Sequence, residues 1–320
     1  MNIIVQKFGG TSVSTEDRRK QVAVKVKEAI DNGFTPIVVV SAMGRKGQPY
    51  ATDTLLTLID DKFKESNRNS KDLLMCCGEI ISSVVVANAL YNEGIQAVPL
   101  TGGQAGIITD DNFCEAEYIS IDIDRLLSVV REGKVPVVTG FQGITKDGYF
   151  TTLGRGGSDT TACILGNAVN AKEIEIYTDV DGIMTADPRI VEDASLIDEI
   201  TYNEVFQLAD QGAKVIHPKA IDLAKKGNIP LFIKNTMGES KGTLVSNNTI
   251  GNERRYITGI TYLNNRIQVR IRLSENSNIK VYQNLLEILA KNHISLDLIN
   301  IFPAHQFFTV DKSEKENVCS

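Results

Sequence analysis

Short apolar, β-branched segments alternate with segments of helical periodicity over the first 247 residues. Such strands, with little polar alternation, are typical of parallel sheets that are covered on both faces. Helices are predicted at residues 18–30 and 72–91, with Ser70 as N-cap of the second. The order predicts a three-layer αβα sandwich with a mainly parallel central sheet. The expected strands are residues 3–8, 36–40, 97–100, 135–139, 173–178 and 230–233.

One hairpin is expected to interrupt this alternation, at residues 143–152. Asp147-Gly148 supplies the two residues of its tight turn. The polar stretch 248–256 has the composition of a linker. Residues 1–247 are therefore predicted to form the first domain.

The pattern after the linker is different. Apolar residues alternate with arginines and a glutamine from 266 to 273, as in a half-buried strand. An amphipathic helix follows, marked by Val281, Leu285, Ile288 and Leu289, and residues 294–302 and 306–310 read as two more strands. Residues 257–320 are thus predicted to be a small α+β domain of β-α-β-β order. One helix covers little of such a sheet, so this domain is expected to be incomplete.

Composition excludes some classes of protein. Hydrophobic residues make up 42%, charged residues 23%, and the formal net charge is −6. A mildly acidic chain has no overall electrostatic reason to bind nucleic acid or an anionic membrane. The five cysteines show no metal-ligand spacing, and no signal segment or membrane-length apolar run is seen, so we expect a cytoplasmic protein with reduced thiols.

Lys7-Phe8-Gly9-Gly10-Thr11-Ser12 lies between an expected strand and an expected helix. Paired glycines let backbone N–H groups approach an anion closely, and Lys7 adds a positive charge. A plain strand-to-helix turn is the alternative. The lysine before the glycines and the hydroxyls after them favour phosphate binding.

A second motif runs Gly154-Arg155-Gly156-Gly157-Ser158-Asp159 and opens an expected helix. A capped, glycine-rich turn would account for the glycines, for Ser158 as N-cap and in part for Asp159. It does not account for Arg155. A guanidinium among glycines is well placed to grip a carboxylate or phosphate.

Acidic residues provide two further signals. Asp179, Asp181 and Asp187 follow the end of an expected strand, where ligands bind in open α/β sheets. They could hold Mg²⁺ or nucleotide hydroxyls, or belong to an Asp-rich loop with local turns. Glu79 lies in an otherwise apolar helix, where a carboxylate usually has a partner or a ligand.

Taken together, these motifs resemble the aspartate kinase branch of the amino-acid kinase family. The match includes the Lys-Phe-Gly-Gly-Thr-Ser start, Gly78-Glu79, the Gly-Arg-Gly-Gly-Ser-Asp motif, Thr178-Asp-Val-Asp-Gly and Asp187-Pro-Arg, in order and in spacing. The segment Ser-Ala-Met-Gly-Arg-Lys-Gly from position 41 is similar to single-function enzymes of Bacillus-type bacteria. The C-terminal domain resembles the first part of an ACT domain, so feedback by amino acids is expected to be lost.

The resemblance implies a role for each matching residue. Lys7, Gly9 and Gly10 would contact the transferring phosphoryl group, with Asp159 organising the lysines around it. The remaining assignments form two groups. Those implied for the amino-acid substrate are Ser41, Thr52, Glu79 for the α-ammonium, Arg155 for the α-carboxylate, and Ser158. Those implied for the nucleotide are Thr178, Asp179, Met184 (where some members place a tyrosine), Arg189 and Lys214. No metal ligand is assigned.

The implied activity is transfer of the γ-phosphoryl group of ATP to the β-carboxylate of L-aspartate. The product would be 4-phospho-L-aspartate, the first intermediate towards diaminopimelate, lysine, threonine and methionine. Mg²⁺ is the implied cofactor, and a homodimer or a higher homo-oligomer the implied assembly. Two alternatives stay open: a kinase of the same fold acting on glutamate, acetylglutamate or a nucleotide, and a non-catalytic amino-acid-sensing protein.

Overall fold

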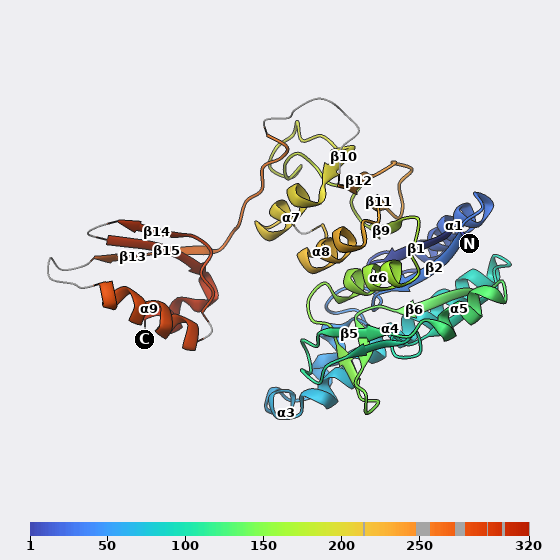
Figure 1. Cartoon of the computed structure of the whole chain (residues 1–320), viewed down its shortest axis with the longest axis horizontal. Coiled ribbons are helices and arrows are strands. Elements are labelled where there is room, and N and C mark those ends of the chain that lie inside the picture. Colours follow the sequence, from blue (N-terminus) through green and yellow to red (C-terminus); the bar gives the residue numbers. More distant parts are fainter. Residues whose placement is uncertain (214, 248–256, 273–278, 293, 303–304, 320) are drawn as a thin grey trace. The chain divides into compact units, whose positions relative to one another are not determined.

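The computed structural model describes residues 1–213, 215–247, 257–272, 279–292, 294–302 and 305–319, with backbone only for residues 279–284 and 319. The chain divides into two compact units, Met1–Thr261 and Tyr262–Ser320 (Figure 1). The predicted linker, 248–256, lies outside the described residues. Ile260 donates its N–H to the carbonyl oxygen of Thr185 at 2.8 Å, so residues just after that stretch belong to the larger unit.

An eight-stranded sheet forms the centre of the larger unit, in the order β10-β12-β11-β9-β1-β2-β6-β3. Neighbours from β11 to β3 are parallel, whereas β12 runs antiparallel to β11. The predicted, mainly parallel sheet is therefore confirmed. Its strands are β1 (Ile3–Phe8), β2 (Thr35–Val40), β3 (Ala97–Leu100), β6 (Val135–Thr139), β9 (Ile174–Thr178), β10 (Glu199–Thr201), β11 (Leu231–Asn235) and β12 (Thr243–Ser246).

Helices cover both faces of this sheet, and the alternation of side chains along β2 shows how. Ile37 and Val39 join one buried cluster with α6 (Gly157–Ala168), next to which α8 (Pro218–Gly227) packs (Figure 1). Val38 and Val40 join a second cluster with α1 (Glu16–Asp31) and α4 (Arg68–Asn92). Both faces are apolar, so β2 is buried almost throughout. The remaining helices of this unit are α2 (Thr52–Leu55), η1 (Leu56–Leu58), α3 (Asp61–Ser66), α5 (Asp124–Arg131) and α7 (Tyr202–Asp210).

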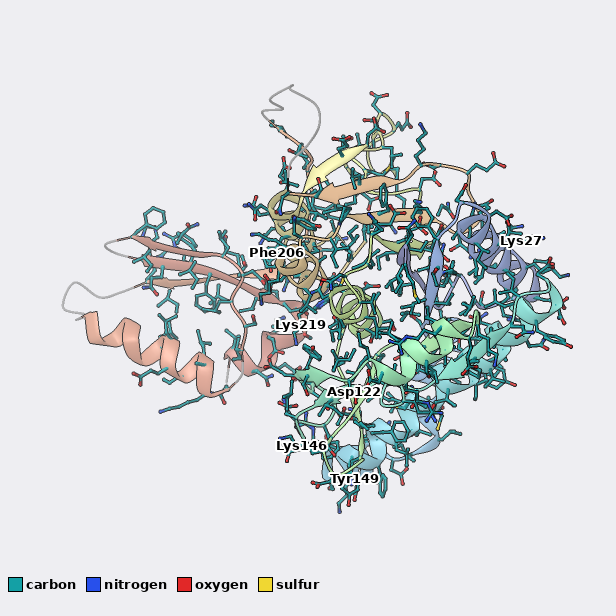
Figure 2. All side chains as sticks on the ribbon, turned by 45° about the vertical axis from the view of Figure 1, so that its right-hand side comes forward. Lys27, Asp122, Lys146, Tyr149, Phe206 and Lys219 are labelled. Carbon is teal, nitrogen blue, oxygen red and sulfur yellow. The ribbon has the colours of Figure 1, made fainter. Side chains whose placement is uncertain are left out.

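The predicted hairpin forms, but in a sheet of its own. Strands β7 (Gln142–Ile144) and β8 (Phe150–Thr152) pair antiparallel and belong to a four-stranded sheet, β5-β4-β7-β8, with β4 (Ile107–Thr109) and β5 (Tyr118–Ile121). Gly148, with φ of +84°, makes the turn by donating its N–H to Thr145. Lys146 and Tyr149 lie at the exposed tip (Figure 2). This small sheet packs against α4 through β8.

Helix α4, with 25 residues, is the longest described helix of the larger unit. By length and composition it is the one described helix that could cross a membrane, yet Asp72 and Glu79 are buried in it and it packs against α1, β3, β6 and β8. These contacts are those of a core helix. The prediction of Ser70 as its N-cap is wrong: the helix begins at Arg68 after Asn67, and Ser70 lies within the first turn.

The smaller unit has the predicted β-α-β-β order. Strands β13 (Arg266–Arg272), β15 (His305–Asp311) and β14 (Ile299–Phe302) form an antiparallel sheet, and α9 (Ile279–Lys291) lies between β13 and β14 in the chain. Leu289, Phe308 and Val310 are at the centre of its core. The charged C-terminal residues form two short helices, η2 (Lys312–Glu314) and α10 (Lys315–Cys319).

Candidate active site

A cavity of about 330 Å³ opens where β1, β2 and β6 end. Because these neighbouring strands are parallel, their carboxyl ends meet at one edge of the sheet, which is where open α/β sheets bind ligands. Seven of the predicted site residues line this cavity: Lys7, Ser41, Thr52, Glu79, Arg155, Ser158 and Asp159. Residues that are far apart in sequence thus meet here.

Lys7 is the cation at the centre of the site. It lies one residue before the end of β1, and its Nζ is 2.7 Å from Oδ1 of Asp159, in the first turn of α6. The two side chains are only 11% and 12% exposed. Such a partly dehydrated pair interacts more strongly than a surface ion pair. The pair therefore holds the ammonium group at the wall of the cavity.

Glu79 contributes a buried carboxylate from α4. Its Oε1 accepts the N–H of Ala42 at 3.1 Å, whereas Oε2 is buried without a hydrogen-bond partner in the described part of the chain. Burial raises the pKa of this carboxyl to about 8, against the opposing effect of the Ala42 N–H. A cation placed next to this buried carboxyl group would stabilise its ionised form.

The glycine-rich loop brings Arg155 to the cavity. Gly154 and Gly156 both have φ of +71°, a conformation that favours glycine. The prediction that Ser158 caps α6 is wrong, because the helix begins at Gly157 with Gly156 in the N-cap position. Ser158 instead lines the cavity from the first turn. Arg155 is exposed on the cavity wall, and its guanidinium has no hydrogen-bond or ion-pair partner among the described residues.

The paired glycines of the first motif differ in their surroundings. The N–H of Gly9 donates to the carbonyl of Tyr177 at 3.1 Å, so it joins β1 to β9 instead of facing the cavity. A Cβ on Gly10 would lie 2.6 Å from the carbonyl oxygen of Ala42, so only glycine fits there. Helix α1 begins at Glu16, capped by Thr15, so this motif is a turn several residues ahead of the helix.

The residues predicted to bind nucleotide do not line this cavity. Thr178 ends β9, Asp179 accepts a hydrogen bond from Arg45 at 2.6 Å, and Met184 is half-buried. The side chain of Arg189 donates two hydrogen bonds to Asp187, at 3.0 and 2.7 Å, and its backbone N–H donates a third at 2.9 Å. Lys214 lies outside the described residues. Thr178 and Asp179 lie at the end of β9, and Met184 and Arg189 follow in the segment after it.

Each of the three aspartates considered as Mg²⁺ ligands contacts a different side chain. Asp179 pairs with Arg45, Asp181 accepts from Asn235 at 2.7 Å, and Asp187 pairs with Arg189. Within the described ranges, no group of three or more acidic, cysteine or histidine side chains is placed to hold a metal ion. The described residues thus do not fit a metal cage made by the protein alone.

One cavity residue was missed from the sequence, and so was one packing contact of the glycine-rich loop. Phe141 lines the cavity with φ of +71°, held by a hydrogen bond from its N–H to Thr161 at 3.0 Å. His217 packs against Gly156, where a Cβ would lie 2.2 Å from that of the histidine. Phenylalanine rarely adopts positive φ, so nothing in the sequence marks it. The close packing of Gly156 against His217 joins segments about 60 residues apart.

A model of the amino acid kinase family matches residues 2–235, well over half of the chain. The chain belongs to the amino acid kinase family. Aspartokinase 1 of Bacillus subtilis is 44% identical over 99% of this chain and 79% of its own length. Aspartokinase of Geobacillus stearothermophilus is 39% identical over 93% and 72%. The predicted resemblance to the aspartate kinase branch is confirmed.

Solved structures of the family agree with the fold. Aspartokinase III of Escherichia coli, in complex with aspartate and ADP, has a TM-score of 0.75 and is 28% identical to this chain. The match covers 97% of this chain and 78% of that one. That aspartokinase thus has a similar fold over nearly all of this chain.

Proposed function

We propose that this protein transfers the γ-phosphoryl group of ATP to the β-carboxylate of L-aspartate, giving 4-phospho-L-aspartate and ADP. The main observation behind the proposal is that one cavity contains both a buried carboxylate, which can accept an ammonium group, and a guanidinium. Glu79 supplies the first and Arg155 the second. Together they suit the two charged groups on Cα of a free amino acid. The related aspartokinases support the same activity.

The chemistry requires charge compensation more than proton transfer. The β-carboxylate is ionised at neutral pH, so no general base is needed. The obstacle is the repulsion between this anion and the polyphosphate. Lys7, held by Asp159, and the N–H of Gly10 would stabilise the oxygens of the transferring group. Exclusion of water would protect the acyl phosphate once it is formed.

ATP is the phosphoryl donor in this account, as the ADP in the E. coli relative suggests. Thr178, at the end of β9, would bind the nucleotide together with Asp179, Met184, Arg189 and Lys214. Mg²⁺ neutralises the phosphates of ATP in kinases generally, and here it would enter as part of the nucleotide. None of the steps assigned to this chain's residues depends on where that ion lies.

The setting of the enzyme is part of the proposal. We place it in the cytoplasm, as a homodimer or a higher homo-oligomer, at the first step of the lysine, threonine and methionine route. The smaller unit would be part of an ACT-like regulatory domain. The boundaries 1–247 and 257–320 remain predictions.

A coupled assay of ADP release tests the function. Purified protein is given ATP with aspartate, with glutamate, with acetylglutamate or with no acceptor. We expect ADP release that depends on aspartate and is far weaker with the other acceptors. Preference for glutamate or acetylglutamate would indicate a different kinase of this fold. No turnover with any acceptor would favour a sensing protein.

A further inference from the structure

Asp72 is a fully buried carboxylate outside the cavity. It lies on α4 seven residues before Glu79, about two turns away on the same side of the helix. Its oxygens accept three hydrogen bonds: from the N–H of Thr152 at 3.0 Å, from the hydroxyl of Thr152 at 2.7 Å and from the N–H of Cys114 at 2.9 Å. A buried carboxylate needs such donors, and here all three come from beyond α4.

These donors belong to the two segments that flank the glycine-rich loop. Thr152 is the last residue of β8, three positions before Arg155. Cys114 has φ of +75°, and its carbonyl oxygen lies 3.6 Å from where a Cβ of Gly154 would be. Ala116 also donates its N–H to Thr152, at 2.8 Å. Asp72 therefore fixes the point at which this loop begins.

The other end of the loop is fixed as well. Asp159, which follows the loop, forms the ion pair with Lys7. Arg155 lies between the two anchors, and Glu79 lies on the same rigid helix as Asp72. Gln142 ties that helix to β7, since its amide donates to the carbonyl of Cys76 at 2.7 Å. The separation of Glu79 from Arg155 thus depends on the contacts around Asp72.

We propose that Asp72 is a positioning residue that sets the place of Arg155 relative to Glu79 and so the length of amino acid that the site accepts. This inference rests on the proposed function of those two residues. If they hold the charged groups on Cα, their spacing fixes how far the side-chain carboxylate reaches towards Lys7. A displacement of about 1 Å is enough to cost a large factor in rate. Aspartate and glutamate differ in reach by one methylene group.

Asp72→Asn is the direct test, because it keeps the shape of the side chain. An amide cannot accept all three bonds, since its NH₂ group would face a donor. We expect KM for aspartate to rise at least about tenfold while KM for ATP stays within about twofold. The ratio of kcat/KM for aspartate to that for glutamate should fall by a similar factor. A change of selectivity is not expected from a merely structural role.

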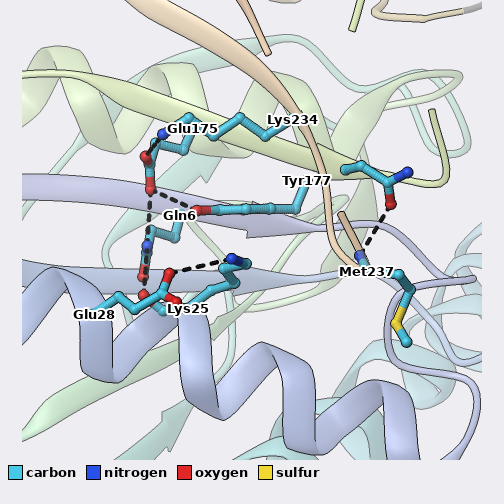
Figure 3. A network of polar contacts seen from close by, with 8 residues as sticks. Gln6, Lys25, Glu28, Glu175, Tyr177, Lys234 and Met237 are labelled. Atoms are coloured by element: carbon cyan, nitrogen blue, oxygen red, sulfur yellow. Dashed lines mark hydrogen bonds and ion pairs between the residues drawn. The ribbon is translucent and has the colours of Figure 1, made fainter. Parts of the chain in front are cut away.

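Two further variants make the test decisive. Thr152→Val removes the hydroxyl that donates to Asp72 and leaves the carboxylate in place. It tests the same proposal if Asp72→Asn does not fold. Glu175→Gln is the matched control, because Glu175 is also a buried carboxylate with several partners, Gln6, Tyr177 and Lys234, in a separate network (Figure 3). It should lower thermal stability and leave the selectivity between aspartate and glutamate unchanged.

The proposal is overturned if folded Asp72→Asn and Thr152→Val keep the wild-type KM for aspartate and the wild-type selectivity. It is also overturned if their KM values for aspartate and ATP rise together, as a general loosening would cause. Failure of the proposed function is distinguishable, because the wild-type protein itself would then not phosphorylate aspartate.

Discussion

Nζ of Lys7 lies 2.7 Å from Oδ1 of Asp159, and this pair joins the end of β1 to the first turn of α6. It connects residues about 150 positions apart in the wall of the cavity. A lysine held in this way loses little conformational freedom when a phosphoryl group arrives. The pair thus accounts for how a flexible side chain becomes a fixed positive charge.

Removing that charge should slow the reaction without unfolding the protein. We expect Lys7→Ala to lower kcat by about 10²–10³, the usual effect of losing one preorganised transition-state charge. Steady-state kinetics and a thermal melt measure both properties. Lys20→Ala, on the exposed face of α1, is the control and should turn over normally. A folded Lys7→Ala enzyme with normal kcat would contradict the role of Lys7.

Arg155→Lys tests whether the guanidinium of Arg155 binds the α-carboxylate of aspartate. Lysine keeps the charge but loses the planar fork that binds a carboxylate at two points. KM for aspartate should rise by about tenfold or more, as the loss of about 1.4 kcal/mol or more requires, with KM for ATP little changed. Arg131→Lys, at the exposed last residue of α5, is the matched control. A rise confined to KM for ATP would move Arg155 to the nucleotide side of the site.

The raised pKa of Glu79 predicts a pH dependence of aspartate use. The carboxyl is largely protonated below about pH 8, whereas pairing with the substrate ammonium requires the ionised form. We expect kcat/KM for aspartate to rise from pH 6 to 8, by up to about tenfold per unit. Glu79→Gln should abolish this rise and leave weak activity. An unchanged rise in Glu79→Gln would show that another group titrates.

The same shift predicts that Glu79 lowers the stability of the free enzyme at high pH. Between its ordinary value of 4.5 and about 8, the folded state keeps a proton that the unfolded state releases. The free energy of unfolding therefore falls as pH rises through this range. At pH 8, Glu79→Gln should be more stable than wild type by about 1–3 kcal/mol, and at pH 5 by much less. Urea unfolding at both pH values measures this, and an equal difference at both would contradict it.

Alanine substitutions at Gly9 and Gly10 are expected to differ in their effect on the stability of the fold. A Cβ on Gly10 would lie 2.6 Å from a backbone oxygen of Ala42, whereas one on Gly9 would make ordinary contacts of 3.5 Å or more. Gly10→Ala should therefore destabilise the fold by about 1–3 kcal/mol and Gly9→Ala by less. Thermal melts of the two variants compare them. Equal melting temperatures would mean that the turn adapts.

The sequence was sufficient for the six strands from β11 to β3 of the large sheet and for most residues of the cavity. Uninterrupted apolar strands such as β2 predict burial on both faces, and motifs that follow parallel strands must meet at one edge. Glu79 was predictable because a carboxylate in an apolar helix requires a ligand or partner. These features depend on local pattern alone.

The errors arose where contacts between distant segments decide the structure. Ser158 has the chemistry of an N-cap, but Gly156 takes that position against His217. The Gly9 N–H is occupied by Tyr177 across the sheet, which no local pattern reveals. Asp72 looked like a helix residue among others, and its role follows only from its bonds to Thr152 and Cys114.

The most direct measurement is the identity of the phosphorylated carbon. The enzyme is incubated in the cold with ATP and aspartate labelled with ¹³C at either C1 or C4, and the product is followed by NMR. The account predicts ¹³C–³¹P coupling at C4 alone, in a species that forms only when the enzyme, ATP and aspartate are all present. Coupling at C1, or release of ADP and free phosphate with no coupled carbon, would contradict it.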